Sequence, residues 1–280
     1  MAGGTGGPGG LRATSVLAAL GAFAGRPPAA PPAGRFARPD VPGDLAGALD
    51  ALAGPARAWV LDPLGRDAPP PAPGRPRTLA LPAAEGVLAP ARQVDERTCG
   101  AAVLSLLSLA GDPRRAVELA RWPTGPAAAF AGLQRQWHAR TTHGPWGLPS
   151  WPAALGTPPW GAAREARYGR VRYTHRVVGG RGARGVLAAA VDAAAAGAPV
   201  PLYTGGDLAR GVGTAVPRHV VLLTAVRGGL ATLYEPSSGR LHAVPVATLA
   251  DPRADARLRT PALGGWPHVV WALLPRDARG

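Results

Sequence analysis

Residues 93–111 read QVDERTCGAAVLSLLSLAG, a polar loop followed by an apolar run. The second part of this stretch predicts a helix from Thr98 to Leu109, which Gly111 is expected to end. The apolar residues of that helix recur at i, i+3, i+4 and i+7, the spacing of one buried face: Val103, Leu106, Leu107 and Ala110. The polar loop and the first turn of the helix therefore lie together at one end of a buried element.

The elements that follow place helices before most of the strands. Asp112 and Pro113 predict the N-cap and the first residue of a second helix. Further helices are expected at 126–139, at about 160–167 and at 185–196, and strands at 171–178, 200–203, 219–226, 231–234, 241–244 and 269–274. Gly228-Gly229 is a two-residue hairpin signal between two of these strands. This order predicts an α+β domain with an antiparallel sheet.

The N-terminal part of the chain has a different composition. Residues 1–78 are rich in Pro, Gly and Ala, and we expect them to form a largely disordered extension. Within it, a short helix is expected over 44–52 with Asp44 as its cap, and a short strand over 59–61. The packed domain is expected to span residues 79–275.

The net charge of +14 suggests a nucleic-acid partner, but the composition offers another explanation. All 31 basic residues are Arg, and the chain contains no Lys, Asn or Ile, residues whose codons are AT-rich. A GC-rich bacterial genome therefore accounts for the charge. The Arg residues are scattered and no nucleic-acid motif surrounds them, so we expect no nucleic-acid partner.

The chain has one cysteine, which excludes an intramolecular disulfide. The apolar stretch 14–25 has the length of a signal-peptide core but is too short to span a membrane, which needs roughly 20 apolar residues. We expect no membrane span, no cofactor, a cytoplasmic location and a monomer. The weak N-terminal signal leaves secretion as an alternative.

Cys99 is the first candidate catalytic residue. At a helix N-terminus the positive end of the macrodipole favours the thiolate, which is the reactive form of cysteine. Gln93 lies six residues earlier in the polar loop, where its amide and the Cys99 N–H could bind the oxyanion formed by attack on an acyl carbon. Each has a plain alternative, a small buried apolar residue for Cys99 and a solvated loop residue for Gln93.

His219 and Glu235 complete the candidate set. His219 opens an apolar strand, so it lies at a strand end, where it can take a proton from a thiol and return it to a leaving group. Glu235 ends the next strand, sixteen residues on, and the hairpin at 228–229 returns it past His219, where a carboxylate can orient the imidazole. The alternatives are a histidine on a sheet edge and a turn-flanking acid.

These segments resemble a known family. Gln93 to Gly100, as Gln-x5-Cys-Gly before Ala-Ala and an apolar helix, is similar to the nucleophile segment of the papain-like peptidases that mature bacteriocin leader peptides, the double-glycine peptidases, and their stand-alone relatives. The helix at 185–196, the strand at 200–203, a His-initiated strand and an acid-Pro-x-x-Gly turn resemble the second half of that family. The resemblance covers residues 79–274.

The resemblance implies a papain-like two-lobe fold. A helical left lobe would carry the nucleophile helix, a right lobe would be an antiparallel sheet, and the active site would lie between them. The family further implies Cys99 as nucleophile, His219 as base, Gln93 as oxyanion donor and an acid at position 235. It usually has Asp before the proline, so Glu235 puts efficiency in question more than identity. No membrane segment or phosphate-binding loop follows, so leader processing coupled to export is unsupported.

Other aromatic and histidine residues show weaker patterns. Trp146, Trp151 and Trp160 suit a packed crossover between lobes better than a substrate groove. His138 and His143 are five residues apart, but no Cys or acid completes a ligand set, so we expect no metal site.

The sequence therefore predicts a cysteine hydrolase that cleaves a peptide or isopeptide bond in a peptide or protein substrate. It would use a Cys-His-Glu triad and a Gln oxyanion donor. Two alternatives use the same residues: a catalytically silent papain-like domain that binds peptides or a protein partner, and an acyltransferase. Alkylation of the thiol below pH 8.5, and the products formed with amine acceptors, discriminate among the three.

Overall fold

The computed structural model describes residues 36–82, 89–144, 151–206, 217–251 and 254–276. Its helices are α2 (Ala46–Asp50), α3 (Gly54–Leu61), α4 (Cys99–Gly111), α5 (Pro113–Ala120), α6 (Pro126–Thr142), α7 (Pro159–Glu165), α8 (Ala183–Ala195), α10 (Val246–Ala250) and α11 (Ala256–Ala262). Its strands are β1 (Arg77–Thr78), β2 (Arg167–Tyr168), β3 (Val171–Val177), β4 (Val200–Gly205), β5 (His219–Arg227), β6 (Leu230–Glu235), β7 (Arg240–Pro245) and β8 (His268–Arg276). Most of the helices thus precede most of the strands, as predicted.

The described strands form one antiparallel sheet in the order β1-β7-β6-β5-β4-β8-β3-β2. Strands β5 and β6 are joined by the predicted hairpin at Gly228 and Gly229, whose φ angles of 55° and 76° favour glycine. The prediction of an α+β fold with an antiparallel sheet is confirmed.

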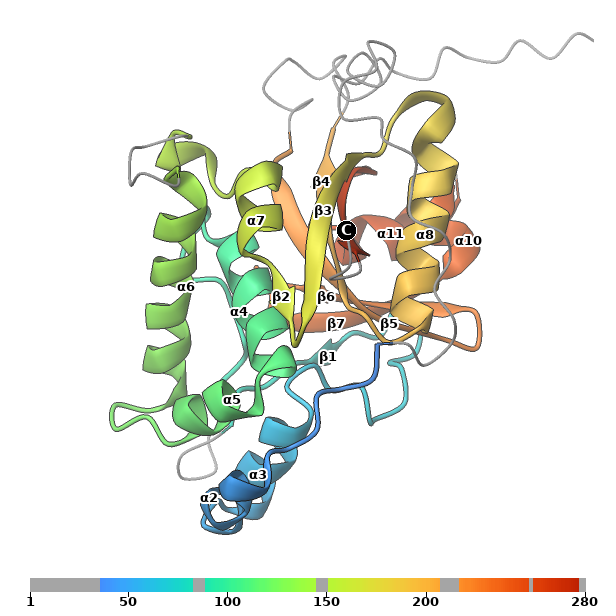
Figure 1. The fold of residues 1–280 in the computed structure, drawn as a ribbon. Helices are drawn as coiled ribbons and strands as arrows, with labels where there is room; N and C mark the ends of the chain where they lie inside the picture. The colour runs from blue at the N-terminus through green and yellow to red at the C-terminus, as the bar shows by residue number, and fades with distance from the viewer. Residues whose placement is uncertain (1–35, 83–88, 145–150, 207–216, 252–253, 277–280) are drawn as a thin grey trace, which may run out of the picture.

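Helices cover both faces of this sheet (Figure 1). Helices α4, α5, α6 and α7 lie on one side, and α8, α10 and α11 lie on the other. Strand β5 is buried on both faces, because Val220 and Leu222 join the apolar cluster that contains α4 whereas Val221 and Leu223 join the cluster that contains α8. A strand with two buried faces has a continuous apolar sequence, and VVLL at 220–223 fits this rule.

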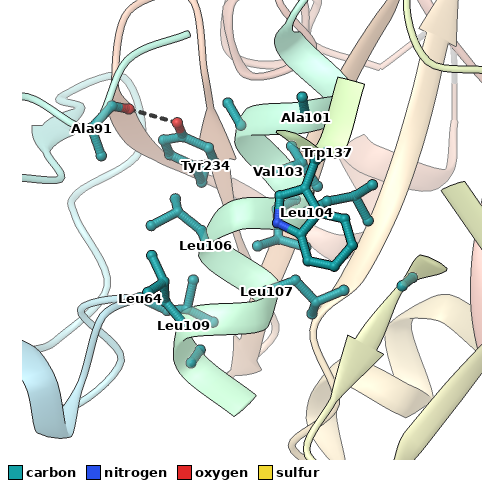
Figure 2. Close-up of a cluster of buried hydrophobic side chains, with 14 of the residues drawn as sticks. Leu64, Ala91, Ala101, Val103, Leu104, Leu106, Leu107, Leu109, Trp137 and Tyr234 are labelled. Carbon is teal, nitrogen blue, oxygen red and sulfur yellow. Dashed lines mark hydrogen bonds between the residues drawn. The ribbon is translucent and has the colours of Figure 1, made fainter. Parts of the chain in front are cut away.

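Helix α4 is the central element of the first cluster (Figure 2). All 13 of its residues are buried, and Trp137 of α6 lies in the same cluster. The helix ends at Gly111, where a Cβ would lie 2.4 Å from the backbone N of Gly169. The predicted helix is confirmed, and it begins at Cys99.

Residues 36–78, expected to be disordered, belong to the packed structure. Trp59 and Val60 of α3, together with Leu64, lie in the same apolar cluster as α4, and β1 extends the sheet beside β7. A few large apolar side chains among many Pro, Gly and Ala residues hold this stretch against the core. This corrects the expected domain boundary at residue 79, whereas residues 1–35 lie outside the described residues.

Two local predictions in this stretch were wrong. The short strand expected over 59–61 is part of α3. A short apolar run is compatible with a helix or a strand, and Pro55 in the first turn favours a helix. Asp44 does not cap α2, and its carboxylate instead lies 2.6 Å from the guanidinium of Arg114. Asp112 caps α5 as predicted, accepting from two backbone N–H groups.

Candidate active site

Helix α4 places Cys99 at the edge of the core. Cys99 is the first residue of the helix and is 5% exposed. The side chain of Thr98 does not cap the helix, since its hydroxyl donates to the O and accepts from the N of Asp95, both at 3.0 Å. The N–H groups of the first turn therefore have neither an intrahelical partner nor a cap from the Thr98 side chain.

His219 is the first residue of β5, where it pairs with Thr204 of β4, and it is 8% exposed. Gly264 follows α11 and closes over the imidazole. A Cβ on Gly264 would lie 2.2 Å from Cδ2 and 2.5 Å from Nε2 of His219. Gly264 also has a φ of +68°, which disfavours any other residue. Only glycine fits there while the ring keeps its position.

Glu235 ends β6 and is 3% exposed. Its Oε1 lies 2.8 Å from Nε2 of His219. The same carboxylate accepts hydrogen bonds from the N–H groups of Ser237 and Ser238, each at 2.8 Å, and from the Ser237 hydroxyl. The long glutamate side chain therefore folds back over its own turn and still meets the imidazole.

The charges of this pair reinforce each other. Burial lowers the pKa of His219, but hydrogen bonds with Cys99 and Glu235 outweigh it and raise the pKa from 6.5 to about 9. Burial raises the pKa of Glu235, but hydrogen bonds from His219 and from the two serines hold it well below its usual range. The pair is an imidazolium beside a carboxylate at neutral pH.

Cys99 lies close enough to His219 for its side chain to raise the pKa of the imidazole. Because Nε2 of His219 faces Glu235, Nδ1 is the ring nitrogen left for the thiol. Side chains from α4, β5 and β6 thus form one continuous series. Tyr203 of β4 lies within electrostatic reach, since burial and then the charge of Cys99 raise the pKa of its hydroxyl.

Gln93 reaches the site with its backbone and not with its amide. Its N–H donates to the O of Pro236 at 2.9 Å, which ties its loop to the turn after Glu235. Its side-chain Nε2 donates to the O of Asp95 at 2.7 Å, and its Oε1 is buried with no hydrogen-bond partner among the described residues. Within that part of the chain, no hydrogen bond joins this amide to Cys99. The predicted oxyanion donor is therefore turned toward its own loop.

Three residues of the site were missed in the sequence. Gly264 precedes a second glycine, and two adjacent glycines by themselves indicate only a turn. Ser237 does carry a signal, because a carboxylate often accepts from the N–H group two residues further along a turn. Tyr203 carries none, since its position follows from the pairing of its strand with β5.

The other candidates from the sequence lie apart from this series or outside the described residues. Trp151 and Trp160 meet edge to face with ring centroids 5.0 Å apart, whereas Trp146 is outside the described residues. Throughout the described segments, no three or more His, Cys, Asp or Glu side chains are grouped so that they could hold a metal ion. In those same segments no helix is both long and apolar enough to cross a membrane.

Comparisons with protein-family models, with curated proteins and with solved structures found no match to this chain.

Proposed function

We propose that this chain is a papain-like cysteine hydrolase that cleaves a peptide or isopeptide bond in a peptide or protein substrate. The observation that carries the proposal is the grouping of three side chains: Glu235 is hydrogen-bonded to His219, and Cys99 lies close enough to raise the pKa of the same imidazole. Burying a charged pair beside a thiol is costly, and strongly shifted ionisable groups cluster at functional sites. The helices α4 to α7 on one side of the sheet support a two-lobe arrangement with the site between helices and strands.

In the proposed reaction, Cys99 acts as a thiolate beside the protonated imidazole of His219, and its sulfur attacks the acyl carbon of the scissile amide. The C=O electron pair moves onto the oxygen, where N–H groups at the start of α4 stabilise it. His219 then protonates the leaving amine as the C–N bond breaks, which leaves a thioester. Water gives a proton to His219 as its oxygen attacks the thioester, and breaking of the C–S bond releases the acid and restores the thiolate beside the imidazolium.

Glu235 and Gln93 have supporting roles in this proposal. Glu235 holds Nε2, so that Nδ1 faces the sulfur, and it stabilises the imidazolium. Gln93 can join the oxyanion site only if its amide leaves the carbonyl of Asp95. That rotation gives up the hydrogen bond made by Nε2, whereas the buried Oε1 has none to lose.

The variant Cys99→Ala tests the proposal. A peptide library is incubated with each protein, and the products are identified by mass spectrometry. We expect cleavage by the wild type and none by Cys99→Ala, with both proteins folded by circular dichroism. Cleavage by the variant at the wild-type rate would contradict the mechanism. The product masses separate hydrolysis from acyl transfer, because a hydrolase adds water to the acyl fragment, whereas a transferase joins that fragment to an amine acceptor.

A catalytically silent domain that binds peptides is the second candidate, and two observations favour it. Cys99 is only 5% exposed, and the amide of Gln93 is bonded to Asp95. This candidate predicts peptide binding without cleavage and a thiol that iodoacetamide does not modify. Because Cys99 is the only cysteine in the chain, a carbamidomethyl mass increase at cysteine reports on this thiol alone.

A further inference from the structure

Thr157 lies against the first turn of α4, beside the residue that follows Cys99. A Cβ on Gly100 would lie 2.6 Å from the Cβ of Thr157 and 2.9 Å from its Oγ1. A Cβ on Gly156 would lie 3.3 Å from the carbonyl O of Arg97. The segment just before α7 therefore crosses both the loop before Cys99 and the turn after it.

The hydroxyl of Thr157 is buried and unpaired. Thr157 is 6% exposed, and its Oγ1 has no hydrogen-bond partner among the residues that the structure describes. An unpaired buried hydroxyl costs stability, and valine would fill the same space without that cost. Packing therefore explains the size of this side chain but not its hydroxyl group.

The surroundings of this hydroxyl suit an oxygen atom that gains negative charge. The first-turn N–H groups of α4 have no side-chain cap from Thr98, and the positive end of the helix dipole lies there. The amide expected to help, that of Gln93, donates to Asp95 instead. An oxygen bound at this end of the helix would pair the Thr157 hydroxyl and the free N–H groups at once.

We propose that Thr157 is an oxyanion donor, whose Oγ1–H donates to the acyl oxygen that also accepts from N–H groups at the start of α4. This inference rests on the proposed function, because it needs Cys99 as the nucleophile. When the bond from Sγ to the acyl carbon forms, the π pair of the C=O bond moves to the oxygen. Thr157 stabilises that charge while its own O–H bond stays intact, so the step needs no other reactant.

Two small reagents isolate this role. Acylation of Cys99 by p-nitrophenyl acetate passes through an oxyanion and releases p-nitrophenolate, whereas alkylation by iodoacetamide displaces iodide and forms no oxyanion. Thr157→Val keeps the branched shape and removes the hydroxyl. We expect the acylation rate to fall about 100-fold. The alkylation rate should stay unchanged, and the Tm should stay level or rise.

Three further variants serve as controls for the effect of Thr157→Val. Thr157→Ser keeps a hydroxyl and should retain most of the acylation rate, and Thr157→Ala should repeat the loss if Thr157→Val does not fold. Thr141→Val is the matched control, because it removes a buried hydroxyl that already donates to the O of Trp137 at 2.9 Å. That control should change neither rate.

The outcomes separate this inference from the proposed function. Equal acylation rates in Thr157→Val and the wild type would overturn the role of Thr157 and leave Cys99 as nucleophile. An equal fall in both rates would also overturn it, since the change would then lie in the thiol. A wild-type protein that neither reagent modifies would overturn the proposed function, and this inference with it.

Discussion

The polar groups around Glu235 are more completely paired than those beside the start of α4. On the side of β5 and β6, the carboxylate of Glu235 accepts from His219, from two backbone N–H groups and from a serine hydroxyl. On the side of α4, Gln93 Oε1 and Thr157 Oγ1 are buried and unpaired among the described residues.

This difference distinguishes polar groups that the protein itself holds in place from polar groups that remain available to a ligand. A completed hydrogen-bond network fixes the orientation of its members. Buried groups without partners cost stability, and they persist in native proteins where function needs them. The paired side thus suits an acid–base pair that is already positioned, and the unpaired side suits a polar atom brought by a substrate.

Among the variants that keep Cys99 and His219, Glu235→Gln is expected to cause the largest loss of activity. The amide keeps the shape of the side chain but removes the charge that stabilises the imidazolium of His219. We expect the kcat/KM for p-nitrophenyl acetate to fall by about 10³-fold, less than for loss of the histidine itself. Glu165→Gln, which removes an acid paired with Arg140, is the control. A loss for Glu235→Gln no greater than for Glu165→Gln would remove the carboxylate from the mechanism.

Stability should depend on pH through the same pair. Because the pKa of His219 is raised from 6.5 to about 9, its protonated form stabilises the folded state fully below pH 6.5. That contribution, on the order of 3 kcal/mol, is lost as the pH rises to about 9. The lowered pKa of Glu235 adds stability that is present above its usual pKa of 4.5 and is lost as the pH falls. Thermal unfolding between pH 5 and 10 measures the alkaline loss, and Glu235→Gln should reduce it. An equal alkaline loss in the variant would show that the pair is not its source.

Gly264→Ala tests whether the imidazole needs its exact position. The new Cβ would lie 2.2 Å from Cδ2 of His219, so the ring must move. A displacement of about 1 Å can cost roughly 100-fold in rate, and we expect a loss of that size for p-nitrophenyl acetate. Gly265→Ala is the matched control, because its φ of +87° is equally unfavourable for alanine but nothing lies within 4 Å of the new Cβ. Equal activity of the two variants would count against a fixed ring.

Gly100→Ala tests whether the position of Thr157 beside the start of α4 affects acylation. The added Cβ would lie 2.6 Å from that of Thr157, so the threonine must shift. We expect about a tenfold slower acylation by p-nitrophenyl acetate, less than for loss of the hydroxyl, with unchanged alkylation by iodoacetamide. Gly132→Ala in α6 meets nothing within 4 Å and should alter neither rate. Unchanged acylation in Gly100→Ala would mean that the position of Thr157 is unimportant.

Much of the fold could be predicted because its elements have strong periods. The spacing of apolar residues in α4 indicated a helix, and the continuous apolar run of β5 indicated a strand. Gly228-Gly229 indicated the hairpin between β5 and β6. Helix α11 was missed because Pro261 lies inside it, where proline normally argues against a helix. The packing of 36–78 was missed because its composition resembles that of a disordered chain.

The candidate site could be predicted in part for a related reason. Cys99, His219 and Glu235 each begin or end a well-marked element, so their positions followed from the elements themselves. The direction of the Gln93 amide depends on its hydrogen bond to the carbonyl of Asp95. No periodic sequence pattern predicts such a contact. The unpaired hydroxyl of Thr157 depends on a close approach to Gly100, and no local pattern indicates it.

The pH dependence of Cys99 alkylation tests most directly whether His219 controls the thiol. An ordinary thiol is only about 1% thiolate at pH 6.5, and its alkylation slows about tenfold for each pH unit below 8.5. We predict that iodoacetamide modifies the wild type at a nearly constant rate from pH 6.5 to 8.5, whereas His219→Gln slows like an ordinary thiol. Coincident pH profiles for the wild type and His219→Gln would contradict the account.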